Sequence, residues 1–192
     1  MKKTVLICCL AVLAIAMLVA AAPNSPADMP QYTADHQLRR PENYRDWVFL
    51  SSGLGMNYSP APGSHDMFTN VFVPRWAYNE FQKSGKWPEK TMFVVEEREA
   101  QSRGSINKHG NFQTDFAGMG VEVKDKSQFP EQWAYFNFGE DTRSASANPK
   151  AGCFNCHDAH AAVEHSFVQF YPTLKPVAKK YETYNAEREK VD

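Results

Sequence analysis

The chain has 192 residues, of which 43% are hydrophobic and 13% aromatic, and its formal net charge is -1. This length suffices for one well-filled domain and is short for two. The nearly neutral charge argues against a nucleic-acid partner and against an anionic membrane surface.

The amino-terminal residues have the features of an export signal. An apolar run over residues 5–20 follows two lysines and ends at the small-residue stretch Val19-Ala20-Ala21. We therefore expect residues 1–21 to be a cleaved signal peptide and the mature protein to lie in the periplasm. The run approaches the length that spans a bilayer, so an uncleaved amino-terminal anchor is the alternative.

The rest of the chain divides into three parts by composition. Residues 22–40 are rich in proline, alanine and polar residues without periodicity, which predicts a flexible leader that lies over the domain or stays mobile. Residues 41–176 alternate apolar runs with turn signals and are expected to form the folded domain. Residues 177–192 are expected to be a charged tail.

Most apolar runs of the folded part are short and rich in β-branched and aromatic residues, which predicts strands. A helix is expected over residues 75–84, because Pro74 stops the preceding strand and Gly85 can end the helix. Several strands with few helices predict a sheet-based α+β fold. The expected strands are residues 47–50, 68–73, 91–98, 112–123 and 133–138.

Cys153-Phe154-Asn155-Cys156-His157 is the most specific motif in the chain. Two cysteines three apart on one turn of helix can each bond a vinyl group of haem, and the following histidine can ligate the iron. The alternatives are a redox dithiol, which needs a βαβ context, and half of a zinc site, which needs a second ligand pair; neither context is visible. The other two cysteines lie in the signal. We therefore expect one covalent haem c, attached through Cys153 and Cys156 and ligated by His157.

The order of these features resembles the cytochrome P-460 family, which includes the cytochromes c′-β. The similarity covers residues 41–176 and is most specific in the cysteine motif and in its spacing to Phe170-Tyr171-Pro172. The other matching stretches are Tyr44-Arg45-Asp46-Trp47-Val48, residues 71–85 and 87–94, Gly104-Ser105-Ile106, Gly110-Asn111-Phe112 and Trp133-Ala134-Tyr135-Phe136.

The resemblance implies a predominantly antiparallel β fold, a homodimer, and a c-type haem that His157 ligates on one side while the other side takes a small ligand. Enzymes of the family oxidise hydroxylamine and link a lysine to the haem edge, whereas the c′-β members lack that link and look like binders of nitric oxide. In this sequence the lysine position falls at Val95, just before Glu96. Because valine has no amine, the link is expected to be absent.

The distal side of the haem is expected to be apolar. In the strand over 91–98, Phe93, Val95 and Glu97 share one face, and Phe93, Val95 and Phe116 are candidates for a dry wall that favours a neutral diatomic ligand. Glu97 is the candidate for the proton acceptor that hydroxylamine chemistry needs. The methionines that can in principle supply a sixth iron ligand are Met56, Met67, Met92 and Met119.

These observations predict a periplasmic mono-haem c-type cytochrome that binds nitric oxide or another small ligand at an open iron position. Two alternatives stay open. One is an enzyme of the same family that oxidises hydroxylamine, and the other is an electron-transfer cytochrome with a redox partner protein. Whether the protein is an enzyme is therefore not decided by its sequence.

Overall fold

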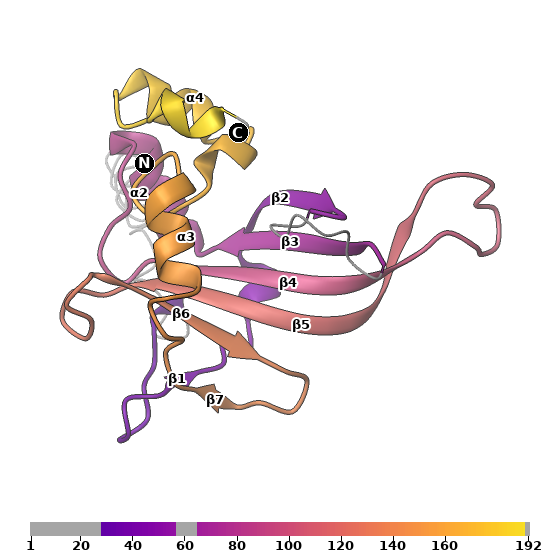
Figure 1. Cartoon of the computed structure of the whole chain (residues 1–192), viewed down its shortest axis with the longest axis horizontal. Coiled ribbons are helices and arrows are strands. Elements are labelled where there is room, and N and C mark those ends of the chain that lie inside the picture. The colour runs from indigo at the N-terminus through magenta and orange to yellow at the C-terminus, as the bar shows by residue number, and fades with distance from the viewer. Residues whose placement is uncertain (1–27, 57–64, 191–192) are drawn as a thin grey trace, which may run out of the picture.

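The computed structural model describes residues 28–56 and 65–190. Its centre is a five-stranded antiparallel sheet in the order β2-β3-β4-β5-β6, and β1 pairs with β7 in a second, small sheet (Figure 1). The strands are β1 (Leu38–Arg39), β2 (Val48–Leu54), β3 (Met67–Val73), β4 (Met92–Gln101), β5 (Phe112–Lys124), β6 (Trp133–Phe138) and β7 (Ser144–Ala145). The predicted α+β fold with a predominantly antiparallel sheet is confirmed.

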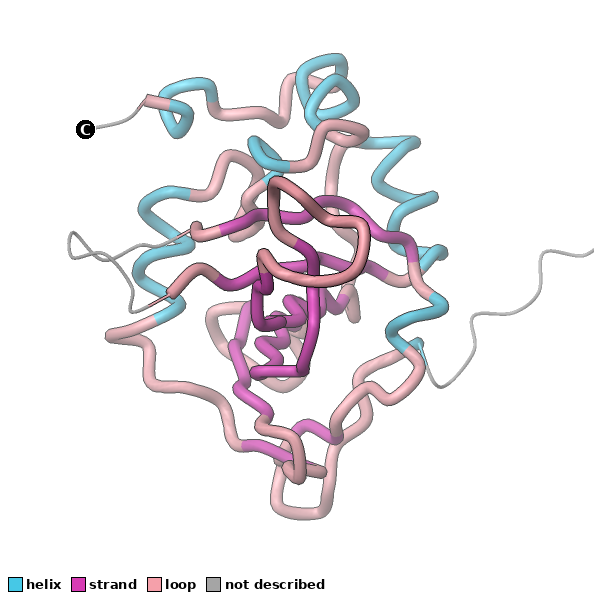
Figure 2. The backbone as a smooth tube through the Cα atoms, turned by 90° about the vertical axis from the view of Figure 1, so that its right-hand side faces the viewer, coloured by secondary structure: helices cyan, strands magenta, loops and turns pink. Residues whose placement is uncertain are grey.

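The α-helices of the described residues gather near one end of the sheet (Figure 1), and Figure 2 shows the strands in the middle with helical segments around them. They are α2 (Arg75–Ser84), α3 (Cys153–His160) and α4 (Lys175–Lys180). α2 covers the predicted residues and ends at Gly85, whose φ of 67° gives the left-handed conformation that commonly closes a helix. Short 3-10 helices cover Tyr44–Asp46, Val168–Phe170 and Ala186–Glu189. No helix in residues 28–56 and 65–190 is long and apolar enough to cross a membrane.

Side chains of the large sheet alternate between two faces, which we call the cavity face and the closed face. One row on the cavity face takes a single residue from each strand, and each residue is paired in register with the next. We call it the floor row. It consists of Ser51, Val71, Val95, Gly120 and Asn137.

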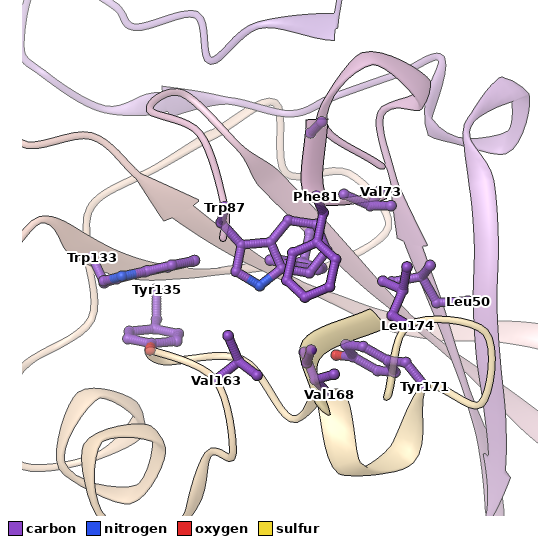
Figure 3. Close-up of a cluster of buried hydrophobic side chains, with 13 residues drawn as sticks. Leu50, Val73, Phe81, Trp87, Trp133, Tyr135, Val163, Val168, Tyr171 and Leu174 are labelled. Atoms are coloured by element: carbon purple, nitrogen blue, oxygen red, sulfur yellow. The ribbon is translucent and has the colours of Figure 1, made fainter. Parts of the chain in front are cut away.

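A hydrophobic core covers the part of the cavity face beside the floor row (Figure 3). Trp87 lies between Phe81 of α2 and Phe93 of β4, with ring centroids 4.1 Å and 4.7 Å away. Tyr171 and Leu174, which follow α3 in the chain, are buried in the same cluster. This core therefore anchors α2 and the chain after α3 against one sheet.

The closed face is covered by the chain that precedes β2. Leu38, Tyr44 and Trp47 are buried against apolar side chains of β4, β5 and β6, and the Trp47 indole N–H donates to the Asp28 carboxylate at 2.8 Å. Of the predicted leader, residues 28–40 thus lie over the domain. The predicted signal peptide falls outside the described residues.

The predicted tail is held to the domain where the structure describes it. Ala178 of α4 is fully buried, and the Thr183 hydroxyl donates to the carbonyl of Gly85 at 2.7 Å. The end of α2 and the chain after α4 are therefore packed together, which a charged composition alone does not reveal.

Candidate haem site

The cysteine motif lies on α3, which packs against β6. The ring centroids of His157 and Tyr135 are 4.5 Å apart, and Phe154 packs on the same tyrosine at 6.5 Å. Cys153 and His157 line a cavity above the floor row, whereas Cys156 lines a second cavity. The single helix thus brings all three residues of the motif to the edge of open space.

The first cavity lies between the floor row and the chain that follows α3. The cavity has a volume of about 170 Å³ and is partly open to solvent. Phe167, Phe170 and Tyr171 line it on the side of α3, and the first two also line the cavity at Cys156. Most of the lining is apolar, so the cavity suits an apolar group.

His157 is oriented by a main-chain hydrogen bond. Its Nδ1 is 2.7 Å from the carbonyl oxygen of His165, and because a carbonyl only accepts, Nδ1 must carry the proton. The ring is held between Tyr135 and Phe167, with centroids at 4.5 Å and 4.4 Å. The other nitrogen, Nε2, is then unprotonated in the neutral ring and available to ligate a metal. A metal-ligating histidine usually has its second nitrogen fixed in this way.

Glu122 is a buried acid beside His157. Its Oε1 is 3.7 Å from His157 Nε2, and its Oε2 is buried with no hydrogen-bond partner among the described residues. Burial raises the pKa of Glu122, and the neighbouring His157 partly opposes this shift. The hydroxyl of Tyr135, paired with Glu122 across the strands, is also buried without a hydrogen bond within the described part of the chain. Burial and the Glu122 charge raise the pKa of Tyr135.

These features fit a haem. The floor row has no side chain at Gly120, where an added Cβ would meet only the Cβ of Val95 at 3.8 Å, so a flat group can approach the sheet there. Cys153 and Cys156 supply two thiols on one turn of helix, and His157 supplies one nitrogen ligand. A single protein ligand is sufficient because the macrocycle provides four nitrogens. No group of three or more histidine, cysteine or acidic side chains is placed to hold an isolated metal ion in residues 28–56 and 65–190.

The predicted distal residues occupy three different places. Val95 lies in the floor row and lines the cavity. Phe93 shares its face but is fully buried in the core against Trp87, so it does not line the cavity. Phe116 lies with the cluster on the closed face, because the β4–β5 register shifts next to Glu97 and pairs Phe116 with Arg98.

The acid inside the cavity is not the one that the sequence singles out. Glu97 pairs with Gly118, one step along β4 from the floor row, and it does not line the cavity. Glu122 does line it. A signal for Glu122 exists in the sequence, because it is a charged residue between Val121 and Val123 in a strand, but only the pairing of β5 shows which acid faces His157.

The four methionines predicted as possible iron ligands also lie in different parts of the fold. Met56 lines the cavity from the end of β2, next to Gly53. Met92 and Met119 are buried in the cluster on the closed face, and Met67 at the start of β3 does not line the cavity. Of the four, Met56 is therefore the one placed on the same cavity as His157.

Comparison with known proteins agrees with this site. A family model described as Cytochrome P460 matches residues 41–168, well over half of the chain. No curated protein matches the sequence. The matched region runs from the start of the domain through the floor row and α3 to the chain that orients His157. The chain belongs to the cytochrome P460 family and is a haem-binding cytochrome.

Proposed function

We propose that this protein is an exported c-type cytochrome with one haem, attached through Cys153 and Cys156 and ligated by His157, which binds nitric oxide or another small neutral ligand. The orientation of His157 is the observation that carries the proposal. Its Nδ1 is bound to the His165 carbonyl, so Nε2 is the nitrogen left to bind iron, and the residue lines the apolar cavity.

The middle of the floor row supports a small neutral ligand rather than a bulky or charged one. Val71 and Val95 present aliphatic side chains, and Gly120 presents none. An apolar wall costs a neutral diatomic little desolvation and costs an anion much more. The haem, when bound, supplies an iron atom that can coordinate such a ligand. Val95 gives no amine for the link that enzymes of this family carry.

Glu122 supports hydroxylamine oxidation as a second candidate function. This reaction needs a proton acceptor near the substrate, and Glu122 contributes a carboxyl group to the lining of the cavity. A carboxylate whose pKa is raised by burial is also a stronger base than an ordinary one. Turnover of hydroxylamine with an electron acceptor, abolished in Glu122→Gln, would favour this function over ligand binding.

Met56 supports the third candidate, an electron carrier with a redox partner protein, because its sulfur could serve as a sixth iron ligand. The absorption spectrum of the ligand-free holoprotein, before and after addition of nitric oxide, tests the three candidates together. We expect a high-spin, five-coordinate spectrum that changes on addition of nitric oxide and is the same in Met56→Ala. A low-spin, six-coordinate spectrum that Met56→Ala converts to high spin would contradict the proposal.

The proposed location and assembly have their own tests. We propose removal of residues 1–21 on export to the periplasm, as predicted from the apolar run at the amino end. Sequencing of the mature protein should find an amino terminus near Ala22. We also propose a homodimer, which sedimentation of the holoprotein should reveal. A monomer, or a chain that keeps its first residues in the membrane fraction, would overturn these two points separately.

A further inference from the structure

The carbonyl that orients His157 belongs to a tight turn over residues 163–166. Val163 and Ser166 are joined by two main-chain hydrogen bonds, of 2.9 Å and 3.3 Å. Glu164 has a φ of 50°, a left-handed conformation that residues other than glycine adopt infrequently. Because this conformation is disfavoured, the turn needs support from its surroundings to present the His165 carbonyl in one place.

A chain of side-chain hydrogen bonds gives that support. The Ser166 hydroxyl is fully buried and donates to the Val163 carbonyl at 2.8 Å. It also accepts from the Trp87 indole N–H at 2.7 Å. An indole nitrogen can only donate, whereas a hydroxyl both donates and accepts. The chain therefore runs in one direction, from Trp87 through Ser166 to the carbonyl of Val163.

Trp87 is itself held rigidly. It is 2% exposed and packs between Phe81 and Phe93 in the core, and Figure 3 shows its indole nitrogen on the side of Val163. Lys124 of β5 adds a second tie, because its Nζ donates to the main-chain oxygen of Trp87 at 2.8 Å and to the Glu164 carboxylate at 2.6 Å. The turn is thus fixed from both ends to the core of the domain.

We infer that Trp87 and Ser166 are positioning residues for His157. The inference rests on the proposed role of His157 as the axial ligand. The two side chains keep the turn in the conformation in which the His165 carbonyl accepts from Nδ1. This hydrogen bond raises the basicity of the imidazole and fixes its plane, and loss of such an outer partner typically costs about 10–100-fold in metal affinity or activity. Neither residue touches the cavity, so their effect passes through His157 alone.

The test compares Trp87→Phe and Ser166→Ala with the wild type as full-length holoproteins. Each variant removes one member of the hydrogen-bond chain. Ser166→Ala removes a single oxygen atom, so it can test the inference even if Trp87→Phe fails to fold. The readout is the iron–histidine stretching frequency of the ferrous protein by resonance Raman, together with the reduction potential. We expect a lower frequency and a higher potential in both variants, because a weaker Nδ1 hydrogen bond makes the imidazole a poorer donor.

Trp47→Phe is the matched control. Trp47 is also buried and also donates its indole N–H, to Asp28 at 2.8 Å, but it lies on the closed face of the sheet. This variant should lose stability and keep the wild-type frequency. Unchanged frequencies in Trp87→Phe and Ser166→Ala, or an equal shift in Trp47→Phe, would overturn the inference. The proposed function predicts attached haem in every one of these proteins. Intact mass therefore shows whether the proposed function has failed or only the positioning role of Trp87 and Ser166.

Discussion

Two buried glutamates on neighbouring strands have opposite environments. Glu96 of β4 is 1% exposed on the closed face, and Glu122 of β5 is 6% exposed on the cavity face. The Glu96 carboxylate accepts from the Tyr44 hydroxyl at 2.7 Å, from the Asn70 amide at 3.2 Å, and from two arginines that also pair with it, Arg45 and Arg98. Glu122 has His157 at 3.7 Å, and its second oxygen has no hydrogen-bond partner among the described residues.

The difference in hydrogen bonding distinguishes a structural glutamate, Glu96, from Glu122, which faces the candidate site on the same sheet. Burial alone would raise the pKa of Glu96, but hydrogen bonds from Arg98, Tyr44 and Asn70 bring it below its usual value. Glu122 has no such donors among the described residues, so burial leaves its pKa raised. Buried polar groups in a finished core are paired. The unpaired polar groups of Glu122 and Tyr135 therefore mark the part of the cavity face where we expect a bound group to complete the packing.

The largest effect that this comparison predicts is on stability, in Glu96→Gln. The amide keeps the shape of the side chain but loses the charge that Arg45 and Arg98 pair with. Because Arg45 is half-exposed, we expect a loss of about 2 kcal/mol, as for hydrogen bonds to charged groups. Urea unfolding of the holoprotein should show this loss in the free energy of unfolding. A loss below about 0.5 kcal/mol, the size of an ordinary surface substitution, would show that the closed face does not depend on Glu96.

Acid should remove the same contribution in the wild type. Because the folded pKa of Glu96 is lowered, the folded state binds the proton less tightly than the unfolded state. The contribution is therefore fully present above the usual glutamate pKa of about 4.3. It is lost as pH falls from there through the lowered folded value. Unfolding curves of wild type and Glu96→Gln should converge over this acid range, and curves that stay parallel would contradict the assignment.

On the cavity face, Gly120→Leu should affect ligand binding more than stability. The added side chain meets only Val95 near its base, at 3.8 Å, and otherwise enters the cavity. Unfolding free energy should stay the same or rise by up to about 1 kcal/mol, since glycine is unfavourable within a strand, while nitric oxide binding by the holoprotein is largely lost. Gly118→Ala is the control, because its added Cβ meets the flexible end of Glu97 at 3.0 Å outside the cavity. Equal binding by both variants and the wild type would argue against a ligand site over the floor row.

Glu122→Gln should have a smaller effect on stability than Glu96→Gln, and in the opposite direction. Because the folded pKa of Glu122 is raised, the wild type loses stability as pH rises through that value, and an amide avoids this cost. At pH 8 the variant should be more stable than the wild type by about 1 kcal/mol. Thermal unfolding of both proteins at pH 5 and pH 8 measures how the difference in stability changes with pH. A variant that is less stable than the wild type at pH 8 would mean that Glu122 is paired as Glu96 is.

Much of the fold follows from local sequence signals. The helix over Arg75–Ser84 has a proline before it and a glycine after it, and four of the six residues of β6 (Trp133–Phe138) are aromatic, so both were predictable within a residue. The pairing of Leu38–Arg39 with Ser144–Ala145 was not. Those strands are two residues long and far apart in the sequence, so nothing local marks them, and the leader was expected to be flexible for that reason.

The site was predictable only in part, because the pairing and packing of the strands decide which side chains reach the cavity. Alternation places Val95 and Phe93 on one face of β4, and it does so correctly. It cannot tell that Phe93 lies under Trp87, because that contact depends on how α2 packs. Phe116 is moved to the closed face by an irregularity in the β4–β5 pairing. Glu122 reaches His157 because β5 lies beside β6 under α3, a neighbourhood that no single strand encodes.

The central claim is that a haem is joined to α3 beside an open cavity, and the intact mass of the mature protein tests it most directly. The protein should be produced in a host that attaches haem to exported cytochromes. The account predicts the mass of the polypeptide from about Ala22 onward plus one haem, and the polypeptide mass alone for the double variant Cys153→Ser, Cys156→Ser. A wild-type protein that carries no added mass under these conditions would contradict it.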